Sequence, residues 1–132
     1  MTIANVMLID DEEHIIEYVT ELIESIGFKV IGFAHGAREA LEKLQRLDPD
    51  IILLDVTMPG IPGSELVAEI KKRKQHVKVI MLTSRNTVHI VKTCIKNGAE
   101  GYILKNQGDE YIRQKLFDVC GVNQNLESCE PQ

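Results

Sequence analysis

The chain has 132 residues, of which 44% are hydrophobic, and carries a formal net charge of −5. This length suffices for one domain with a continuous core and is too short for two ordinary domains. No apolar stretch approaches the roughly 20 residues of a membrane-spanning helix, and the N-terminus lacks the basic flank of a secretory signal, so we expect a cytoplasmic protein without a membrane partner. The acidic balance argues against direct nucleic-acid binding, which depends on clustered Lys and Arg.

Short apolar runs alternate with segments of helical periodicity along the whole chain. Continuous apolar runs are typical of strands buried on both faces, and apolar residues three or four apart are typical of helices. The elements predicted in chain order are strand 6–9, helix 15–26, strand 28–33, helix 37–47, strand 51–54, helix 63–70, strand 77–82, helix 88–95, strand 101–104 and helix 112–119. Gly27, Asp48-Pro49 and Asn97-Gly98 supply helix stops.

This alternation predicts an α/β fold, a doubly wound five-stranded parallel sheet, because right-handed crossovers place helices on both of its faces. Residues 1–120 form the predicted domain. Residues 121–132 show no periodicity and are expected to form a mobile C-terminal tail. The three cysteines fit no zinc pattern and are expected to be reduced thiols.

Reactive side chains follow four of the predicted strands. Asp10 and Asp11 follow the first strand, Asp55 the third, Thr83 the fourth and Lys105 the fifth. Each alone has an ordinary explanation as a helix cap, turn former or surface charge. Ligands of open parallel sheets bind beyond the carboxyl ends of the strands, where these five side chains would converge.

Three carboxylates at one point repel each other unless a cation lies among them. Ligands that are all oxygen favour Mg²⁺. A metal-bound carboxylate beside a lysine and a hydroxyl suits phosphoryl transfer, and the chain has no Gly-rich loop to bind a nucleotide. The sequence therefore predicts that a phosphoryl group is transferred to a side chain.

Several separated motifs in the same order resemble the receiver domain of two-component response regulators, including its CheY-like single-domain members. These motifs are Asp10-Asp11, the segment 54–60 (Leu-Asp-Val-Thr-Met-Pro-Gly) with Gly63, Leu82-Thr83-Ser84, and Lys105. The resemblance spans roughly residues 4–119. It implies a flavodoxin-like (βα)5 fold with strand order 2-1-3-4-5.

The resemblance also implies the roles of the acidic residues. Asp55 is then the phosphoacceptor, and Asp11, Asp55 and the backbone carbonyl of Thr57 are direct Mg²⁺ ligands. Asp10 would act largely through metal-bound water.

Five further positions receive roles. By resemblance, Lys105 pairs with the acceptor carboxylate, the Thr83 hydroxyl bonds the phosphoryl group, and Tyr102 occupies the aromatic switch position. From their places beside the entry to the site, Thr57 and Arg85 are expected to tune the lifetime of the phosphorylated form.

One position departs from the family pattern, because Asn106 stands where a proline usually follows the lysine. A cis bond before a non-proline residue costs about 3 kcal/mol, so the Lys105–Asn106 bond is expected to be trans. Gly108 offers the backbone freedom that this loop then needs. Lys105 is still expected to reach Asp55 with its four-carbon stem.

The predicted function is that of a phosphoacceptor signalling domain rather than a conventional enzyme. Its expected partners are a sensor histidine kinase or phosphotransfer protein and a downstream effector, with a monomer or a phosphorylation-dependent dimer as the assembly. Three alternatives stay open: a receiver portion of a longer transcriptional regulator, a phosphorylation-independent binding module, and a Mg²⁺-dependent phosphohydrolase. The phosphohydrolase would need a cap insertion, for which the short loops leave little room.

Overall fold

The computed structural model describes residues 2–121, and its five parallel strands form one sheet in the order β2-β1-β3-β4-β5. Both the fold class and the strand order agree with the prediction. The strands are β1 Asn5–Ile9, β2 Lys29–Ala34, β3 Ile51–Asp55, β4 Lys78–Thr83 and β5 Gly101–Leu104. The helices are α1 Glu13–Ser25, α2 Ala37–Lys43, α3 Gly63–Arg73, the 3-10 helix η1 Arg85–Ile90, α4 Val91–Lys96 and α5 Asp109–Cys120.

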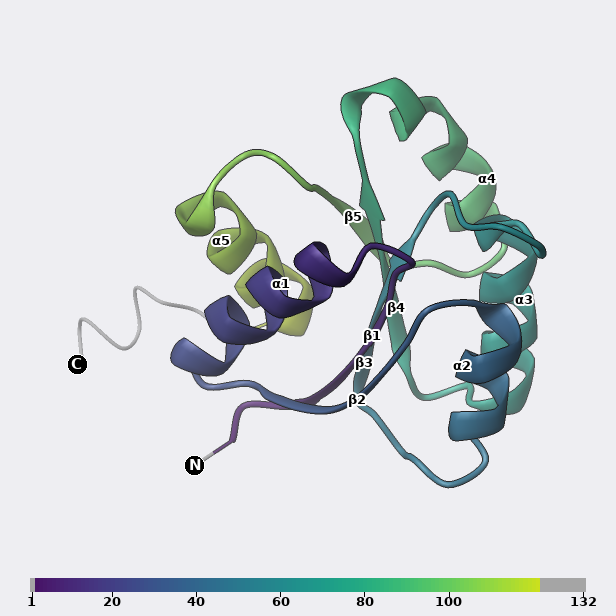
Figure 1. Ribbon diagram of the computed structural model, residues 1–132, viewed down its shortest axis with the longest axis horizontal. Coiled ribbons are helices and arrows are strands. Elements are labelled where there is room, and N and C mark those ends of the chain that lie inside the picture. Colours follow the sequence, from purple (N-terminus) through teal and green to yellow (C-terminus); the bar gives the residue numbers. More distant parts are fainter. Residues whose placement is uncertain (1, 122–132) are drawn as a thin grey trace.

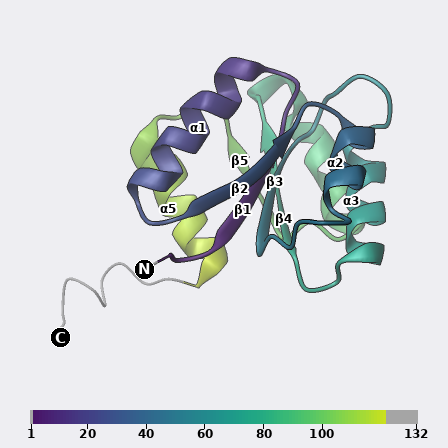
Figure 2. The same ribbon diagram turned by 60° about the horizontal axis from the view of Figure 1, so that its bottom comes forward.

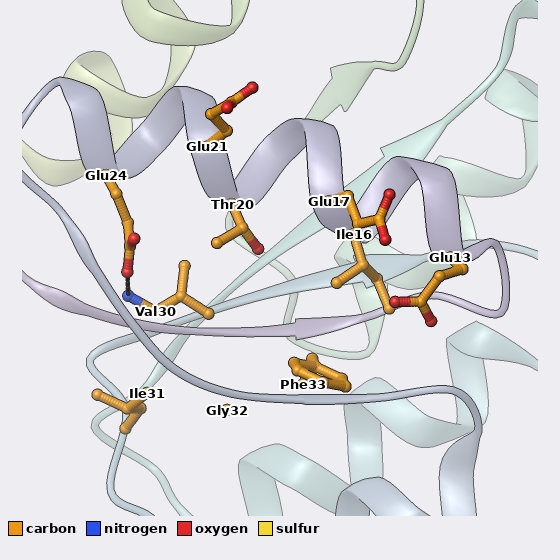
Figure 3. Close-up of a pocket in the computed structure, with 10 residues that line it drawn as sticks. All are labelled: Glu13, Ile16, Glu17, Thr20, Glu21, Glu24, Val30, Ile31, Gly32 and Phe33. Atoms are coloured by element: carbon orange, nitrogen blue, oxygen red, sulfur yellow. Dashed lines mark hydrogen bonds between the residues drawn. The ribbon is translucent and has the colours of Figure 1, made fainter.

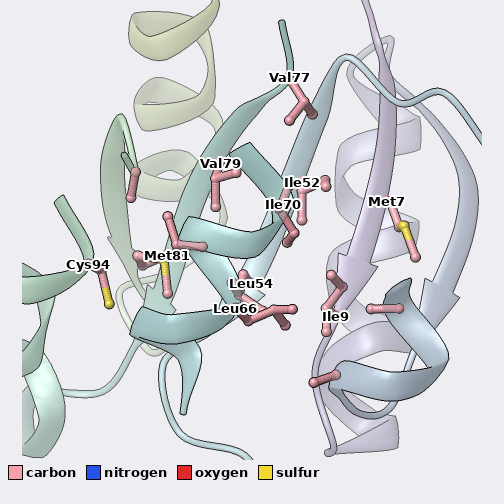
Figure 4. Close-up of a cluster of buried hydrophobic side chains, with 14 of the residues drawn as sticks. Met7, Ile9, Ile52, Leu54, Leu66, Ile70, Val77, Val79, Met81 and Cys94 are labelled. Carbon is pink, nitrogen blue, oxygen red and sulfur yellow. The ribbon is translucent and has the colours of Figure 1, made fainter. Parts of the chain in front are cut away.

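Helices cover both faces of the sheet, with α1 and α5 on one face and α2, α3 and α4 on the other (Figures 1 and 2). Alternate residues of the central strand β3 supply the two cores. Ile51 and Leu53 pack in the core beneath α1 and α5. Ile52 and Leu54 pack in the core beneath α2 and α3 (Figure 4). All five residues of β3 are buried, as a central parallel strand requires.

The segment predicted as one helix over 88–95 differs from the expectation. It consists of η1 followed by the six-residue α4, and Val88 and Ile95 are 36% and 46% exposed. Val91 and Cys94 alone among these apolar residues are buried. A 3-10 helix has about 3.0 residues per turn, so Val88 does not share the face that an α-helix would give it.

Of the predicted tail, the structure describes Gly121 alone. Gly121 ends α5 in a left-handed conformation with φ 76°, and the rest of the predicted tail lies outside the described residues. Cys94 and Cys120 are free thiols, and Cys129 also lies outside the described part. Among residues 2–121, no helix combines the length and the apolar character needed to cross a membrane.

Candidate functional site

The carboxyl edge of the sheet gathers the side chains that the sequence singled out. Asp10 follows β1, Asp55 ends β3, Thr83 ends β4 and Lys105 follows β5. Parallel pairing aligns these ends, since Asp55 lies opposite Leu82 in β4. Asp10, Asp55 and Thr83 are the buried polar residues of the described chain. Their burial at one edge marks this point as a site rather than an ordinary loop surface.

Lys105 lies at the centre of the site. Its Nζ lies 3.0 Å from Asp10 Oδ2, 3.3 Å from Asp55 Oδ1 and 3.4 Å from Glu12 Oε2. The lysine side chain is only 10% exposed. The expectation that Lys105 reaches Asp55 is therefore confirmed, and one ammonium serves three carboxylates.

The carboxylates outnumber the cation that faces them. Asp10, Asp11, Glu12 and Asp55 each offer an oxygen within 4.8 Å of the others. Asp10 Oδ2 is buried without a hydrogen bond of acceptable geometry, although Lys105 Nζ is close. A buried oxygen with spare capacity beside uncompensated negative charge suits a cation with oxygen ligands, so these residues fit Mg²⁺.

The electrostatics of the site raise the pKa values of both Asp55 and Lys105. Burial, and then the negative charge of Asp10, raise the pKa of Asp55 from 3.8 to about 7, against the opposing effect of Lys105. Burial alone would lower the pKa of Lys105, but its contacts with Asp10 and Asp55 outweigh burial and raise that pKa. The lysine therefore stays protonated at neutral pH, while the Asp55 carboxyl group is ionised only at an energetic cost.

The backbone around the carboxylates is fixed by short local bonds. The amide of Thr57 donates to Asp55 Oδ1 at 3.2 Å, and the amide of Glu12 donates to Asp10 Oδ1 at 2.8 Å. Gly63 begins α3 directly against this loop: a Cβ there would lie 2.7 Å from the carbonyl oxygen of Val56. Glycine at 63 thus permits the close approach that holds the segment after Asp55 in place.

Thr83 is placed at the site with its hydroxyl engaged elsewhere. Its Oγ1 lies 2.7 Å from Thr87 Oγ1 and 3.1 Å from the carbonyl oxygen of Ser84. Tyr102 is partly buried and packs against the core beneath α2 and α3. The Nζ of Lys115 lies 5.2 Å from the centre of the Tyr102 ring, within the range of a cation–π contact.

The loop after β5 agrees with the expectation for Asn106. No cis peptide bond occurs within residues 2–121, so the Lys105–Asn106 bond is trans. Gly108 adopts φ 94°, a conformation that favours glycine, and precedes α5. The chain thus turns away from β5 without a proline and still leaves Lys105 over the carboxylates.

Thr57 and Arg85 are both exposed beside the site. Thr57 lines a hollow of about 210 Å³ together with Asp55, Lys105 and Glu12. Arg85 lines an adjoining hollow with Lys105. Both residues therefore lie near the approach to Asp55. Their effect on the lifetime of a phosphorylated form stays a prediction.

Sequence reasoning missed two residues of the site. Glu12 belongs to the acidic cluster and approaches Lys105, and Thr87 holds the Thr83 hydroxyl. Adjacency to Asp10-Asp11 was the available signal for Glu12. Thr87 carried no signal, because its role depends on the η1 turn and its Ser84–Thr87 capping box.

A doubly wound sheet with a buried aspartate, a lysine and an acidic cluster at its carboxyl edge defines a receiver-type domain. The family model of the response regulator receiver domain matches residues 6–117. The chain belongs to this family.

Curated relatives fall into two groups. The chemotaxis proteins CheY of Thermotoga maritima and Halobacterium salinarum are 34% and 35% identical, over 76% and 86% of this chain and 83% and 94% of their own. The nitrate/nitrite response regulator NarL of Escherichia coli is 32% identical over 88% of this chain and 54% of its own. The chain thus spans about half the length of NarL and of several other curated relatives.

Solved structures show the same fold. A LuxR-family two-component response regulator from Aurantimonas has a TM-score of 0.83 at 27% identity, covering 92% of this chain and 86% of its own. The CheX–CheY–BeF3–Mg²⁺ complex from Borrelia burgdorferi has a TM-score of 0.80 at 29% identity, covering 87% of each chain.

Proposed function

We propose that this chain is a phosphorylation-dependent response regulator whose phosphoacceptor is Asp55. The observation that carries the proposal is the buried Asp55 carboxylate, which lies 3.3 Å from Lys105 within a cluster of four carboxylates. An aspartate placed there for stability alone would be costly, because burial and Asp10 disfavour its charged form. The cost is explained if the carboxylate acts as a nucleophile.

In the proposed step, an Asp55 carboxylate oxygen attacks the phosphorus of a phosphohistidine in line with the imidazole nitrogen. The P–N bond breaks, its electron pair stays on the imidazole, and an acyl phosphate forms on Asp55. Lys105 neutralises charge on the transferred oxygens. Hydrolysis of the acyl phosphate by water returns the carboxylate, with Thr57 and Arg85 beside the path of that water.

Asp10, Asp11 and Asp55, with the Thr57 backbone carbonyl, would hold Mg²⁺, and Glu12 adds a further oxygen to the cluster. When bound, Mg²⁺ supplies charge that neutralises phosphoryl oxygens. The Mg²⁺ in the similar complex from B. burgdorferi supports this assignment.

Output is proposed to run from Thr83 to the face formed by α4, β5 and α5. The Thr83 hydroxyl bonds Thr87 at 2.7 Å, so turning it toward a phosphoryl oxygen breaks that bond and removes one contact of the η1 turn, whose Ser84–Thr87 capping box remains. Tyr102 then moves into the space that Thr83 leaves, away from Lys115. A free-energy difference of a few kcal/mol is enough to shift such an equilibrium.

The expected partners are a sensor histidine kinase or phosphotransfer protein and an effector protein that binds this face, all in the cytoplasm. The acidic charge argues against direct nucleic-acid contact by this domain. The assembly is proposed to be a monomer, or a dimer that forms on phosphorylation. A role within a longer transcriptional regulator is the alternative that relatives such as the transcriptional regulatory protein YdfI of Bacillus subtilis support.

Replacing Asp55 by Asn tests the proposal. Asn keeps the shape of the side chain but removes the nucleophilic oxygen, so the variant is expected to fold and to take no label from acetyl phosphate with Mg²⁺. Asp118→Asn, on the exposed side of α5, is the matched control and is expected to label like the wild type. Equal labelling of the Asp55 variant, or no labelling of the wild type with any phosphodonor, would contradict the proposal and favour a constitutive binding module.

A further inference from the structure

A groove runs along α1, between this helix and the edge strand β2 (Figure 3). Its volume is about 590 Å³. The lining comes from two segments only, 13–24 of α1 and 30–33 of β2. None of its lining residues takes part in the proposed phosphoryl transfer, so the groove needs an explanation of its own.

The floor of the groove is apolar because of an irregularity in β2. Val6 pairs with Val30 and Leu8 with Phe33, so the extra residue of β2 falls between them. Val6 and Leu8 belong to the core beneath α1, which places Val30 and Phe33 on the same face. Phe33 is nevertheless 41% exposed, since β2 is the edge of the sheet and α1 does not cover the ring, although Lys43 Nζ lies 5.1 Å from the ring centre. An exposed aromatic ring in a groove is a typical anchor point for a partner.

The wall of the groove is a stripe of glutamates on α1. Glu13, Glu17, Glu21 and Glu24 line it at helical spacing, and no Lys or Arg lines it. Glu17 and Glu21 are exposed and form no ion pair or hydrogen bond within residues 2–121. Like charges four residues apart on a helix destabilise it by about 0.2–0.5 kcal/mol per pair, so the free protein bears a small cost that a cationic partner would remove.

The two ends of the stripe are held in place. Glu13 Oε1 lies 2.7 Å from Nε2 of His35, and Glu24 accepts a hydrogen bond from the backbone amide of Val30 at 3.2 Å. The second contact ties the end of α1 to the open edge of β2 (Figure 3). The unpaired charge is therefore concentrated in the middle of the wall, at Glu17 and Glu21.

We propose that this groove binds an extended basic segment of a partner protein, with Lys or Arg at alternate positions and apolar side chains between them. Residues four apart on α1 are separated by about 6 Å along its axis. Alternate residues of an extended chain are separated by about 6.6 Å, so consecutive basic side chains would face Glu17 and Glu21 in register. The intervening side chains point the other way, onto Phe33 and Val30.

Charge and conformation favour an extended basic segment over the other molecules that could occupy the groove. Residues 122–132 contain two glutamates and no Lys or Arg, so the C-terminal part of this chain does not complement the wall. The basic run Lys71 to Lys74 of a second copy lies at the end of helix α3 and is not extended. Nucleic acids and anionic lipid surfaces carry the same sign of charge as the groove and would be repelled.

The test uses a fluorescein-labelled octapeptide of alternating Lys and Val, with a Glu–Val octapeptide as the reversed-charge control. Binding is measured by fluorescence anisotropy on the full 132-residue chain at low salt. Glu17→Lys/Glu21→Lys reverses the centre of the wall at two exposed positions. The matched control Glu42→Lys/Glu65→Lys makes the same change in charge on α2 and α3, across the sheet.

The wild type and the control variant are expected to bind the Lys–Val peptide with dissociation constants within a factor of two of each other. The Glu17/Glu21 variant is expected to bind at least ten-fold more weakly, and Phe33→Ser several-fold more weakly. Amide chemical shifts in the wild type should change over 13–24 and 30–33. Equal weakening in both charge variants, tight binding of the Glu–Val peptide, or no saturable binding by the wild type would overturn the proposal. Labelling of Asp55 by acetyl phosphate should be unchanged in the Glu17/Glu21 variant, which separates this test from that of the phosphoacceptor.

Discussion

Removing the charge of Asp55 should make the metal-free protein more stable at neutral and alkaline pH. The folded-state pKa of Asp55 is about 7, against 3.8 for a fully solvated aspartate. A carboxyl whose pKa is raised by folding contributes its full stability below the unfolded pKa and loses it as the pH rises through the folded pKa. The wild type should therefore lose stability between about pH 4 and pH 7 as Asp55 ionises. The Asp55→Asn variant should not show this pH-dependent loss, because its side chain does not titrate.

The size of the effect follows from the two pKa values. A difference of about three pH units is worth about 4 kcal/mol above pH 7, at about 1.36 kcal/mol per unit. The substitution also lowers the free energy of unfolding by about 1–2 kcal/mol, because it weakens the contact with Lys105 and the hydrogen bond from the Thr57 amide. The net gain is about 2–3 kcal/mol at pH 8. At pH 5 the gain from the charge is only about 1.5 kcal/mol, which the lost contacts cancel.

The assay is urea unfolding of the wild type and Asp55→Asn in EDTA at pH 5 and pH 8, followed by circular dichroism. At pH 8 the variant should also melt about 6–15 °C higher, given the heat of unfolding of a chain of this size. Asp118→Asn is the control and should shift neither midpoint. Two results would show that burial does not raise the pKa of Asp55 as described. One is that Asp55→Asn is no more stable than the wild type at pH 8, and the other is that its gain in stability over the wild type is as large at pH 5 as at pH 8.

Three further predictions follow from the same geometry. Millimolar Mg²⁺ should raise the melting temperature of the wild type, because the ion relieves repulsion among the carboxylates, and should raise that of Asp11→Asn less. A melting temperature of the wild type that does not change with Mg²⁺ would refute the metal assignment. Lys105→Met should lower the free energy of unfolding by about 2–4 kcal/mol at pH 8, since it leaves Asp10 and Asp55 buried and unpaired, and the loss should shrink at pH 5 where Asp55 is neutral. Gly63→Ala should lower the free energy of unfolding by about 1–3 kcal/mol, because the new Cβ would lie 2.7 Å from the Val56 carbonyl oxygen. Gly36→Ala should lower it far less, because nothing lies within 4 Å of a Cβ there. Equal unfolding midpoints for the two variants would show that the loop at Val56 moves to accommodate the methyl group.

The sequence predicted the fold because its signals were local and repeated. Strands β1, β3 and β4 each contain a continuous run of four apolar residues, and strand polarity follows once helices separate the strands. Parallel polarity alone brings Asp10, Asp55, Thr83 and Lys105 to one edge, so the convergence of the site did not require knowledge of the packing. The trans bond at Asn106 could likewise be predicted from the intrinsic cost of the cis form.

Features that depend on tertiary packing or side-chain rotation could not be predicted. Periodicity suggested an α-helix over 88–95, but a capping box between Ser84 and Thr87 starts a 3-10 turn that exposes Val88. The same turn holds the Thr83 hydroxyl, whose rotation no sequence pattern encodes. The exposure of Phe33 depends on an irregular pairing of β2 with β1, which its apolar sequence does not reveal.

Mapping the modified residue shows whether Asp55 accepts the phosphoryl group. The wild-type chain is incubated with acetyl phosphate and Mg²⁺, reduced with borohydride to convert an acyl phosphate to a stable alcohol, digested, and analysed by tandem mass spectrometry. We expect conversion of Asp55 alone, dependent on Mg²⁺ and lost when the metal is chelated. Conversion of Asp10 or Asp11 instead, or of no residue under conditions where the chain is folded, would contradict it.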